Sequence, residues 1–205
     1  VPGGSFKADV DKVLGLFGPD DLWWADGTGQ KYVFRLKGEE AGTRIEENGA
    51  NRAVIKATGW YVNDQDRPVC MGELRLEYYR GQSFVRLYHT VTFAGDPWRE
   101  KLGSYGIRLR LAEAGFDSAA VELDGRRVAG KKVSLLQGSS DGAALTVDGN
   151  TSTGRRSLGA VSLVGTGGTT ALYHRDFWQM APKKLEADAK AGTVTYSYWP
   201  GEAGV

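Results

Sequence analysis

Glycine is the residue that most constrains how this chain can fold. The 205 residues include 29 glycines, about twice the usual share. They are spread along the sequence, and many separate short runs in which apolar and polar residues alternate. Alternation with a period of two is typical of half-buried β-strands, and glycine between such runs is typical of the turns that connect them. The pattern predicts a many-stranded, all-β protein.

The clearest strand signals lie in the middle of the chain. Residues 74–80 and 84–93 form a predicted pair, with a tight hairpin turn at Gly81 and Gln82. Residues 107–111 alternate apolar side chains with arginines, which predicts an inner and an outer face. Further strands are predicted at residues 32–36, 53–61, 119–123, 132–137, 143–147, 158–164, 170–173 and 193–199. Roughly a dozen short strands indicate a sandwich or a barrel, and we expect a large antiparallel β-sandwich.

The best helix signal lies near the N-terminus. Apolar residues recur at helical spacing over residues 5–17, Ser5 can cap the start, and Gly18 with Pro19 ends it. We therefore expect an N-terminal segment with one short helix, residues 1–21, followed by a β-sandwich domain, residues 22–205.

The composition limits which partners and which cellular compartment are expected for this protein. A net charge of +1 with 25% charged residues argues against a nucleic-acid partner. No apolar run is long enough for a membrane span. Cys70 has no second cysteine to pair with and is predicted to be a thiol buried in a strand. The chain starts at Val1 without Met or a signal peptide, as expected of a mature, trimmed or excised chain. We expect an extracellular or periplasmic protein, with the cytoplasm as the alternative.

The sequence offers no strong metal or cofactor motif, and we expect neither group. Gly165 to Gly168 lie between predicted strands without a following helix, which indicates a hairpin turn rather than a phosphate loop. Asn63 to Asp66 resemble the start of a calcium loop but lack the glycine and the closing glutamate that such a loop needs. A polar turn is the favoured interpretation there, and a weak cation site is the alternative.

The segment with the most chemical information begins at His174. Arg175 and Asp176 follow it directly, and Phe177 and Trp178 come next. Aromatic rings of this kind stack on the apolar face of a sugar, and charged groups bind its polar rim. The structural alternative is an ion pair between Arg175 and Asp176 that holds the end of a strand.

Three further residues join the candidates for glycan contact or an interface. Tyr198 and Trp199 belong to an aromatic run near the end of the chain. His89 lies in the predicted strand 84–93, on the face that also carries Leu87 and Val91. A histidine on an apolar face favours a core or interface role with a satisfied ring nitrogen over that of a catalytic base. No catalytic residue is assigned.

Three segments carry a resemblance to a known family. They are residues 51–60, residues 74–93, and residues 175–186 together with 198–200, of which the third is the most specific. In order and spacing they resemble the central β-sandwich domain of the exo-rhamnogalacturonan lyase / YetA-like family, over roughly three quarters of the chain. In that family the sandwich stands between a small barrel and a large α/α toroid, and the toroid is absent from this sequence.

The resemblance implies a β-sandwich module that frames or binds an acidic glycan. Arg175 would pair with a uronate carboxylate and Trp178 would stack on the sugar ring. A lyase needs a carboxylate-neutralising group, a base and an acid in one cleft, so whether this chain is an enzyme by itself stays open. The expected partners are an acidic polysaccharide or a partner domain.

The alternative function is an extracellular, bacterial structural subunit that assembles through β-strand edges into a fibre or coat. The non-helical residues of the N-terminal segment and the strand at residues 193–198 would then reach a neighbouring copy, and the aromatic clusters would be protein anchors. Asn150 opens an N-glycosylation sequon, a common pattern that is weak by itself.

Overall fold

The computed structural model describes residues 17–39, 41–96, 98, 101–111 and 115–203. Within them lie sixteen β-strands and one short 3-10 helix, which confirms the all-β class. The helix predicted at residues 5–17 falls almost entirely outside the described residues, and Phe17 itself is not helical.

The strands pair antiparallel in two sheets. In chain order they are β1 (Leu22–Asp26), β2 (Lys31–Arg35), β3 (Gly42–Asn48), β4 (Arg52–Val62), β5 (Pro68–Tyr79), β6 (Val85–Phe93), β7 (Leu102–Arg110), β8 (Phe116–Leu123), β9 (Arg126–Gly130), β10 (Lys132–Ser139), β11 (Gly142–Val147), β12 (Asn150–Gly154), β13 (Ala160–Gly165), β14 (Gly168–Tyr173), β15 (Lys183–Asp188) and β16 (Thr193–Trp199), followed by η1 (Gly201–Ala203). The larger sheet has twelve strands in the order β12-β11-β10-β15-β16-β7-β1-β2-β4-β5-β6, with β3 added to β4. The smaller sheet has the order β14-β13-β8-β9.

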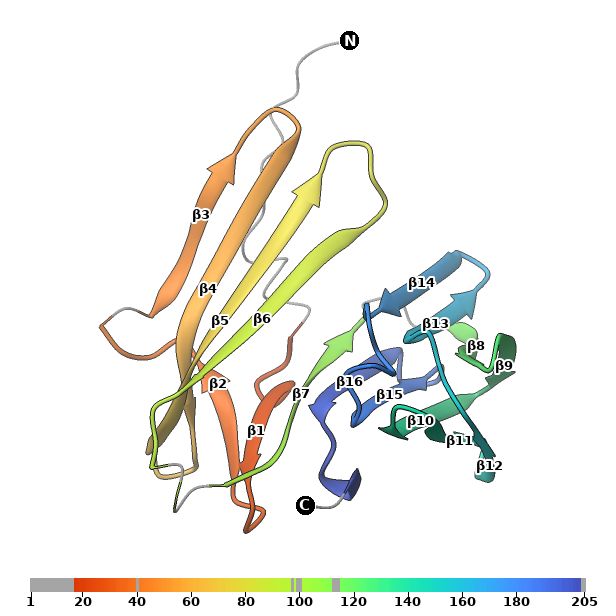
Figure 1. Cartoon of the computed structure of the whole chain (residues 1–205). Coiled ribbons are helices and arrows are strands. Elements are labelled where there is room, and N and C mark those ends of the chain that lie inside the picture. The colour runs from red at the N-terminus through yellow and green to blue at the C-terminus, as the bar shows by residue number, and fades with distance from the viewer. Residues whose placement is uncertain (1–16, 40, 97, 99–100, 112–114, 204–205) are drawn as a thin grey trace.

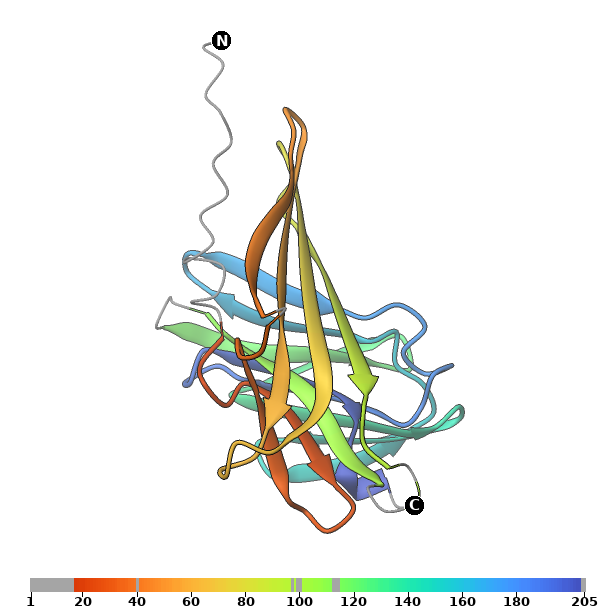
Figure 2. The same cartoon turned by 90° about the vertical axis from the view of Figure 1, so that its left-hand side faces the viewer.

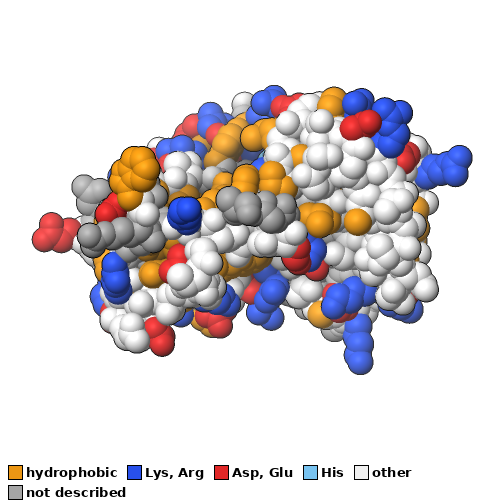
Figure 3. Space-filling model, turned by 60° about the horizontal axis from the view of Figure 1, so that its bottom comes forward, with side chains coloured by type: hydrophobic (Ala, Val, Ile, Leu, Met, Phe, Trp, Pro, Cys, Tyr) orange, Lys and Arg blue, Asp and Glu red, His pale blue; other side chains and the backbone are white. Residues whose placement is uncertain are grey.

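The large sheet forms two halves of different shape. Figure 1 shows β1 to β6 on one side and β8 to β16 on the other, with β7 between them. In Figure 2 the long strands β3 to β6 stand upright, and the strands of the C-terminal half cross them at a steep angle. Viewed from below, hydrophobic side chains gather across the middle of the molecule and Lys and Arg side chains lie around its rim (Figure 3).

The N-terminal half, β1 to β7, is a rolled sheet with an aromatic interior. Trp24 on β1 stacks on Phe93 on β6 with ring centroids 6.0 Å apart, although β2, β4 and β5 separate these strands in the sheet. β4 changes its neighbour along its length, since residues 60–62 pair with β2 and residues 53–58 pair with β3. Gly59 lies at this change, where a Cβ atom would collide with the carbonyl oxygen of Arg35. A glycine inside a strand commonly marks such a close backbone approach.

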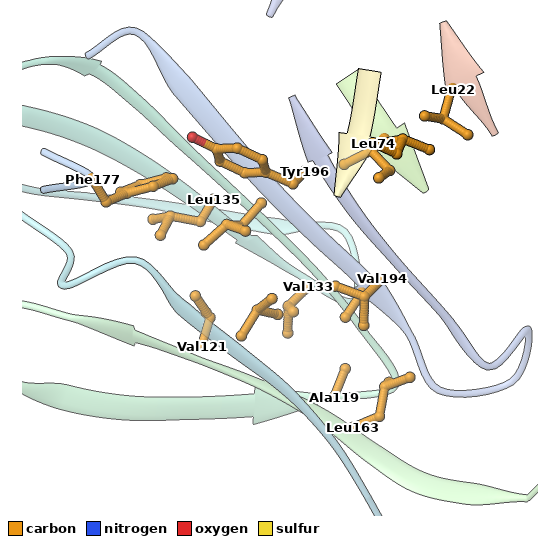
Figure 4. Packing of buried hydrophobic residues seen from close by; sticks show 14 of the residues in the cluster. Leu22, Leu74, Ala119, Val121, Val133, Leu135, Leu163, Phe177, Val194 and Tyr196 are labelled. Carbon is orange, nitrogen blue, oxygen red and sulfur yellow. The ribbon is translucent and has the colours of Figure 1, made fainter. Parts of the chain in front are cut away.

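The C-terminal half is a sandwich of the small sheet on part of the large one. Val121 and Leu163 from the small sheet face Leu135, Val133 and Val194 from the large sheet, and all five are buried (Figure 4). Phe177 from the loop after β14 closes one end of this core and is fully buried. The antiparallel β-sandwich predicted from the sequence is thus present, with more strands than the sequence predicted.

Five strands were not predicted, and their burial explains why. β3, β9 and β12 expose most of their residues, so their sequences show no apolar alternation. In β15 a buried lysine, Lys183, stands at an inward position where an apolar residue would have revealed the strand. β1 carries two adjacent tryptophans that hide its period of two.

Several local predictions are confirmed. β5 and β6 form a hairpin around Gly81, and β13 and β14 form a tight hairpin in which Gly165 pairs with Gly168. Cys70 is a free thiol buried in β5, and burial raises its pKa to about 12. Asn63 accepts two backbone hydrogen bonds through its side-chain oxygen, as expected of a polar turn.

One prediction about assembly is wrong. The strand at residues 193–198 was expected to reach a neighbouring copy, but β16 lies inside the large sheet between β15 and β7. Both of its edges are therefore already hydrogen-bonded, and it cannot accept a further strand.

Candidate functional site

A continuous row of aromatic rings joins the two histidines of the chain. His174 stacks on Tyr196 at 4.7 Å, Tyr196 meets Tyr198 edge-on at 4.5 Å, and Tyr198 meets His89 edge-on at 5.1 Å between centroids. We call these four residues the ring row. The row starts in the loop after β14, crosses β16 and ends on β6, so it couples the sandwich to the rolled sheet.

The His89 end of the ring row is enclosed by tyrosines. The hydroxyl of Tyr61 lies 2.7 Å from Nε2 of His89, and Tyr105 stacks parallel to Tyr198 at 5.0 Å. Gly72 makes the Tyr61 contact possible, since a Cβ atom there would lie 2.9 Å from the Tyr61 ring. One ring nitrogen of His89 thus has a hydrogen-bond partner, as expected of a histidine on the apolar face of a strand.

Burial sets the protonation of His89. As an edge-strand residue it is only half-buried overall, yet its Nδ1 is enclosed and has no hydrogen-bond partner. Desolvation lowers the pKa of His89 to about 4, because charging the ring would cost hydration that the tyrosines do not replace. His89 is therefore neutral near pH 7, and its ring acts as an uncharged member of the row.

The His174 end of the ring row lies close to a buried cation. The ammonium group of Lys183 donates to the carbonyl oxygen of Tyr198 at 2.6 Å, and burial lowers its pKa. The pKa of His174 is also lowered, first by burial and then by the charge of Lys183. Nδ1 of His174 and the hydroxyl of Tyr196 are buried without a hydrogen-bond partner.

A bulge in β16 shapes this end of the row. The pairing of β16 with β7 shifts between Ser197 and Trp199, so Tyr198 is the extra residue. Bulges of this kind re-aim side chains and leave backbone groups without ladder partners. Tyr198 thereby joins the ring row, and Lys183 binds its carbonyl oxygen. Trp199 is half-buried and lies outside the row.

The charged candidates lie on the surface beyond the row. Arg175 is 85% exposed and pairs with Asp176 at 3.2 Å, which is the ion pair considered as the structural alternative. The guanidinium of Arg156 lies over the Trp178 ring, 4.2 Å from its centroid. One face of Trp178 is thus covered by a cation. We call Arg155, Arg156, Arg175 and Trp178 the Arg–Trp rim.

Arg155 and Arg156 are held in place by two carboxylates. Asp124 accepts the backbone N–H groups of both arginines, and these bonds lower its pKa. Asp141 pairs with the side chains of both, at 3.1 and 3.2 Å. Neither arginine was among the site residues predicted from the sequence.

A separate groove of about 300 Å³ lies over β7, β16, β15 and β10. Its lining includes Arg108, Arg110, Lys132, Glu186 and Asp188, and none of the predicted site residues. The two arginines of this groove bind the fully buried Asp21 rather than a free ligand position. The basic side chains of the groove already form ion pairs with carboxylates, so the groove is a weaker candidate than the Arg–Trp rim.

No group of three or more His, Cys, Asp or Glu side chains is placed to hold a metal ion in the described part of the chain. In the same part, no helix has the length and apolar character needed to cross a membrane.

Fold and site together define an antiparallel β-sandwich module with an aromatic interior. Residues 25–117, from within β1 to within β8, match the profile of the PcRGLX-like protein central beta sandwich domain. Over this span the chain is similar to the central β-sandwich domain of a rhamnogalacturonan lyase-like family, in agreement with the resemblance found in the sequence. Searches of curated proteins and of solved structures found no match.

The matched span covers slightly less than half of the chain. It includes residues 51–60 and 74–93, two of the three segments that carried the resemblance. It ends before residues 175–186, the segment expected to be the most specific. His89 therefore lies inside the matched span, whereas His174 and the Arg–Trp rim lie beyond it.

The structure brings together His174, Tyr198 and His89, whereas Arg175 and Trp178 are not members of the ring row. Sequence reasoning missed Tyr61, Tyr105 and Tyr196, which connect and surround the histidines. The alternation in β16, where Val194, Tyr196 and Tyr198 recur at every second position, was the available signal for Tyr196.

Proposed function

We propose that this chain is a β-sandwich module that frames a binding site for an acidic glycan outside the cytoplasm. The observation that carries the proposal is the Arg–Trp rim, where Arg156 lies 4.2 Å over the Trp178 ring and Arg175, three residues before Trp178 in the same loop, is 85% exposed. A planar guanidinium can bind a carboxylate with two parallel hydrogen bonds, and an aromatic edge beside it offers an apolar surface to a sugar ring.

The ion pairs of the rim allow an anionic ligand to bind by exchange. Its three arginines are balanced by three carboxylates, Asp124, Asp141 and Asp176, so the ligand has to replace one of these. Arg175 and Asp176 are both exposed, and an exposed ion pair of this kind contributes little free energy. A uronate carboxylate can therefore replace Asp176 as the partner of Arg175 at small cost.

The ring row has a supporting role in this proposal. His174 stacks on Tyr196, and the neighbouring Phe177 is fully buried, so the base of the loop is anchored in the core. The loop holds Arg175 and Trp178 at its surface. His174, Tyr198 and His89 then position the site without touching the glycan.

Catalysis is assigned to a partner domain. Lyase chemistry needs a base and an acid on opposite sides of an enclosed sugar, and the Arg–Trp rim is an open surface. The isolated chain should therefore bind pectic oligosaccharides without cleaving them. Appearance of unsaturated uronate in the ultraviolet spectrum on incubation with this chain alone would show that the assignment is wrong.

Binding can be tested by calorimetry with acidic pectic oligosaccharides. We expect Arg175→Ala and Trp178→Ala each to weaken binding at least about fivefold, corresponding to about 1 kcal/mol. Arg127→Ala, on the exposed strand β9, removes the same charge elsewhere and should leave binding unchanged. Methyl-esterified oligosaccharides, which lack the charge, should bind poorly. Equal affinity of the wild type and both rim variants would exclude this site.

A further inference from the structure

The end strand β6 has an open hydrogen-bonding edge. Within the described chain, β6 pairs with β5 alone and closes the order of the large sheet. The backbone N–H of Ala94 donates to the carbonyl of Val69, which fixes the phase of the β5–β6 ladder. In an antiparallel ladder the bonding direction alternates from residue to residue. The backbone N–H and C=O groups of the even-numbered residues of β6 therefore bond to β5. The backbone groups of the odd-numbered residues face the open edge, and we call these the outward residues: Val85, Leu87, His89, Val91 and Phe93.

This edge lacks the features that normally prevent strand pairing. Natural edge strands are protected by lysines, prolines, bulges or short length. β6 is nine residues long, contains no Lys or Pro, and pairs with β5 without a register shift. Arg86 is its only residue charged near pH 7, and Val85 and Tyr88 are 45% and 46% exposed.

The other sheet ends are protected or short. β12 and β9 have five residues each and β14 has six, and β9 carries two arginines. β3 pairs with β4 and carries charged side chains, and its register shifts between Ile45 and Glu47. With nine residues, β6 is the longest of these edges and offers the most backbone groups to a further strand.

The sequence of β6 is complementary to itself. When two copies are placed antiparallel with His89 opposite His89, all nine residues find a partner. Every outward residue then meets an outward residue, as hydrogen-bonded pairs require. Val85 lies opposite Phe93, and Leu87 lies opposite Val91. On the other face Arg86 lies opposite Thr92, so no two charges of the same sign oppose each other near pH 7.

We propose that a second copy of this chain pairs with β6 in antiparallel orientation, with His89 at the two-fold axis. Such a pairing is isologous and closes at a dimer. It differs from the fibre or coat considered from the sequence, which needs two complementary edges. The proposal is independent of glycan binding, because the Arg–Trp rim belongs to loops of the C-terminal half.

A pair of opposite substitutions at Thr92 tests the proposal. Thr92 is exposed and faces Arg86 of the copy in the proposed register. We expect Thr92→Lys to weaken the dimer at least about fivefold and Thr92→Glu to strengthen it, since like charges opposite each other are unfavourable and opposite charges are favourable. The double variant Arg86→Glu with Thr92→Lys should restore association. Sedimentation of the whole chain over a range of concentrations measures each dissociation constant.

Two controls make the outcome decisive. Thr153→Lys places the same charge on β12, the opposite end of the same sheet, and should leave the dimer unchanged. Amide hydrogen exchange should show protection that rises with protein concentration at Leu87, His89 and Val91, and not at Arg86, Tyr88 and Thr90. A wild-type chain that stays monomeric, or equal effects of Thr92→Lys and Thr153→Lys, would overturn the proposal.

Discussion

The hydroxyl of Tyr61 lies 2.7 Å from Nε2 of His89, although β5 separates their strands β4 and β6. The side chain of Tyr61 reaches across the middle strand at Gly72, which has no side chain to block it. This contact connects the rolled sheet to the ring row, and through Tyr198 and Tyr196 to His174. It explains why a histidine on an edge strand is enclosed on its inner face.

Tyr61→Phe removes the partner of His89. We expect the free energy of unfolding to fall by about 1–3 kcal/mol, because a buried ring nitrogen loses its hydrogen bond. Urea denaturation near pH 7 measures the change. Tyr88→Phe, on the same hairpin but 46% exposed, is the matched control and should change stability by less than about 0.5 kcal/mol. Equal losses in the two variants would show that the contact adds nothing.

His89 should make stability depend on pH. Its folded-state pKa of about 4 lies below the ordinary value of 6.5, so between these values the unfolded chain binds the proton and the folded chain does not. Stability should thus be complete above pH 6.5 and fall as the pH decreases toward 4. From pH 7 to pH 5 the expected loss is about 2 kcal/mol.

The control for this pH dependence is His89→Gln. Half-buried His174 contributes in the same direction and remains in the variant, so the difference between the two curves isolates His89. Denaturation midpoints at pH 7, 6 and 5 provide the comparison. If the wild type and the variant lose stability in parallel over this range, the enclosure of His89 is weaker than the geometry indicates.

Gly72→Ala should destabilise the fold. Its Cβ atom would lie 2.8 Å from the Phe34 ring and 2.9 Å from the Tyr61 ring, so both rings must move. We expect a loss of about 1–3 kcal/mol, as for other overpacked cores. Gly138→Ala is the control, since its Cβ would come no closer than 3.9 Å to the carbonyl of Gly142. Thermal unfolding of both variants measures the effect, and similar melting temperatures would contradict it.

Lys183→Met should raise the pKa of His174. Burial is the larger cause of the lowered pKa and is retained in the variant, whereas the nearby positive charge is removed. Nuclear magnetic resonance titration of the His174 ring measures the shift. Lys190→Met, on the exposed turn before β16, removes the same charge and should leave this pKa in place. An unchanged value in Lys183→Met would show that the ammonium group is too far away to matter.

Local patterns in the sequence were sufficient for the class of fold. Alternation in β4 to β7 and the turn at Gly81 predicted strands that the structure contains, because burial of one face of a strand imposes a period of two on its residues. The thiol of Cys70 was placed correctly for the same reason. Strands whose two faces are both exposed, such as β12, leave no such period and were missed.

The candidate site depended on contacts that no local pattern records. The sequence marked His89 and His174 as unusual residues, but it could not show that Tyr196 and Tyr198 connect them. That connection requires the large sheet to roll until β6 approaches β16, and the roll depends on Gly59 and Gly72 together with the pairing of distant strands. Likewise Arg156 lies over Trp178 because two loops meet in space. Composition and periodicity thus determined the all-β class, and three sequence segments carried the resemblance to one family. The tertiary structure decided which side chains share a site and which strand edge stays open, since both depend on packing between residues far apart in the chain.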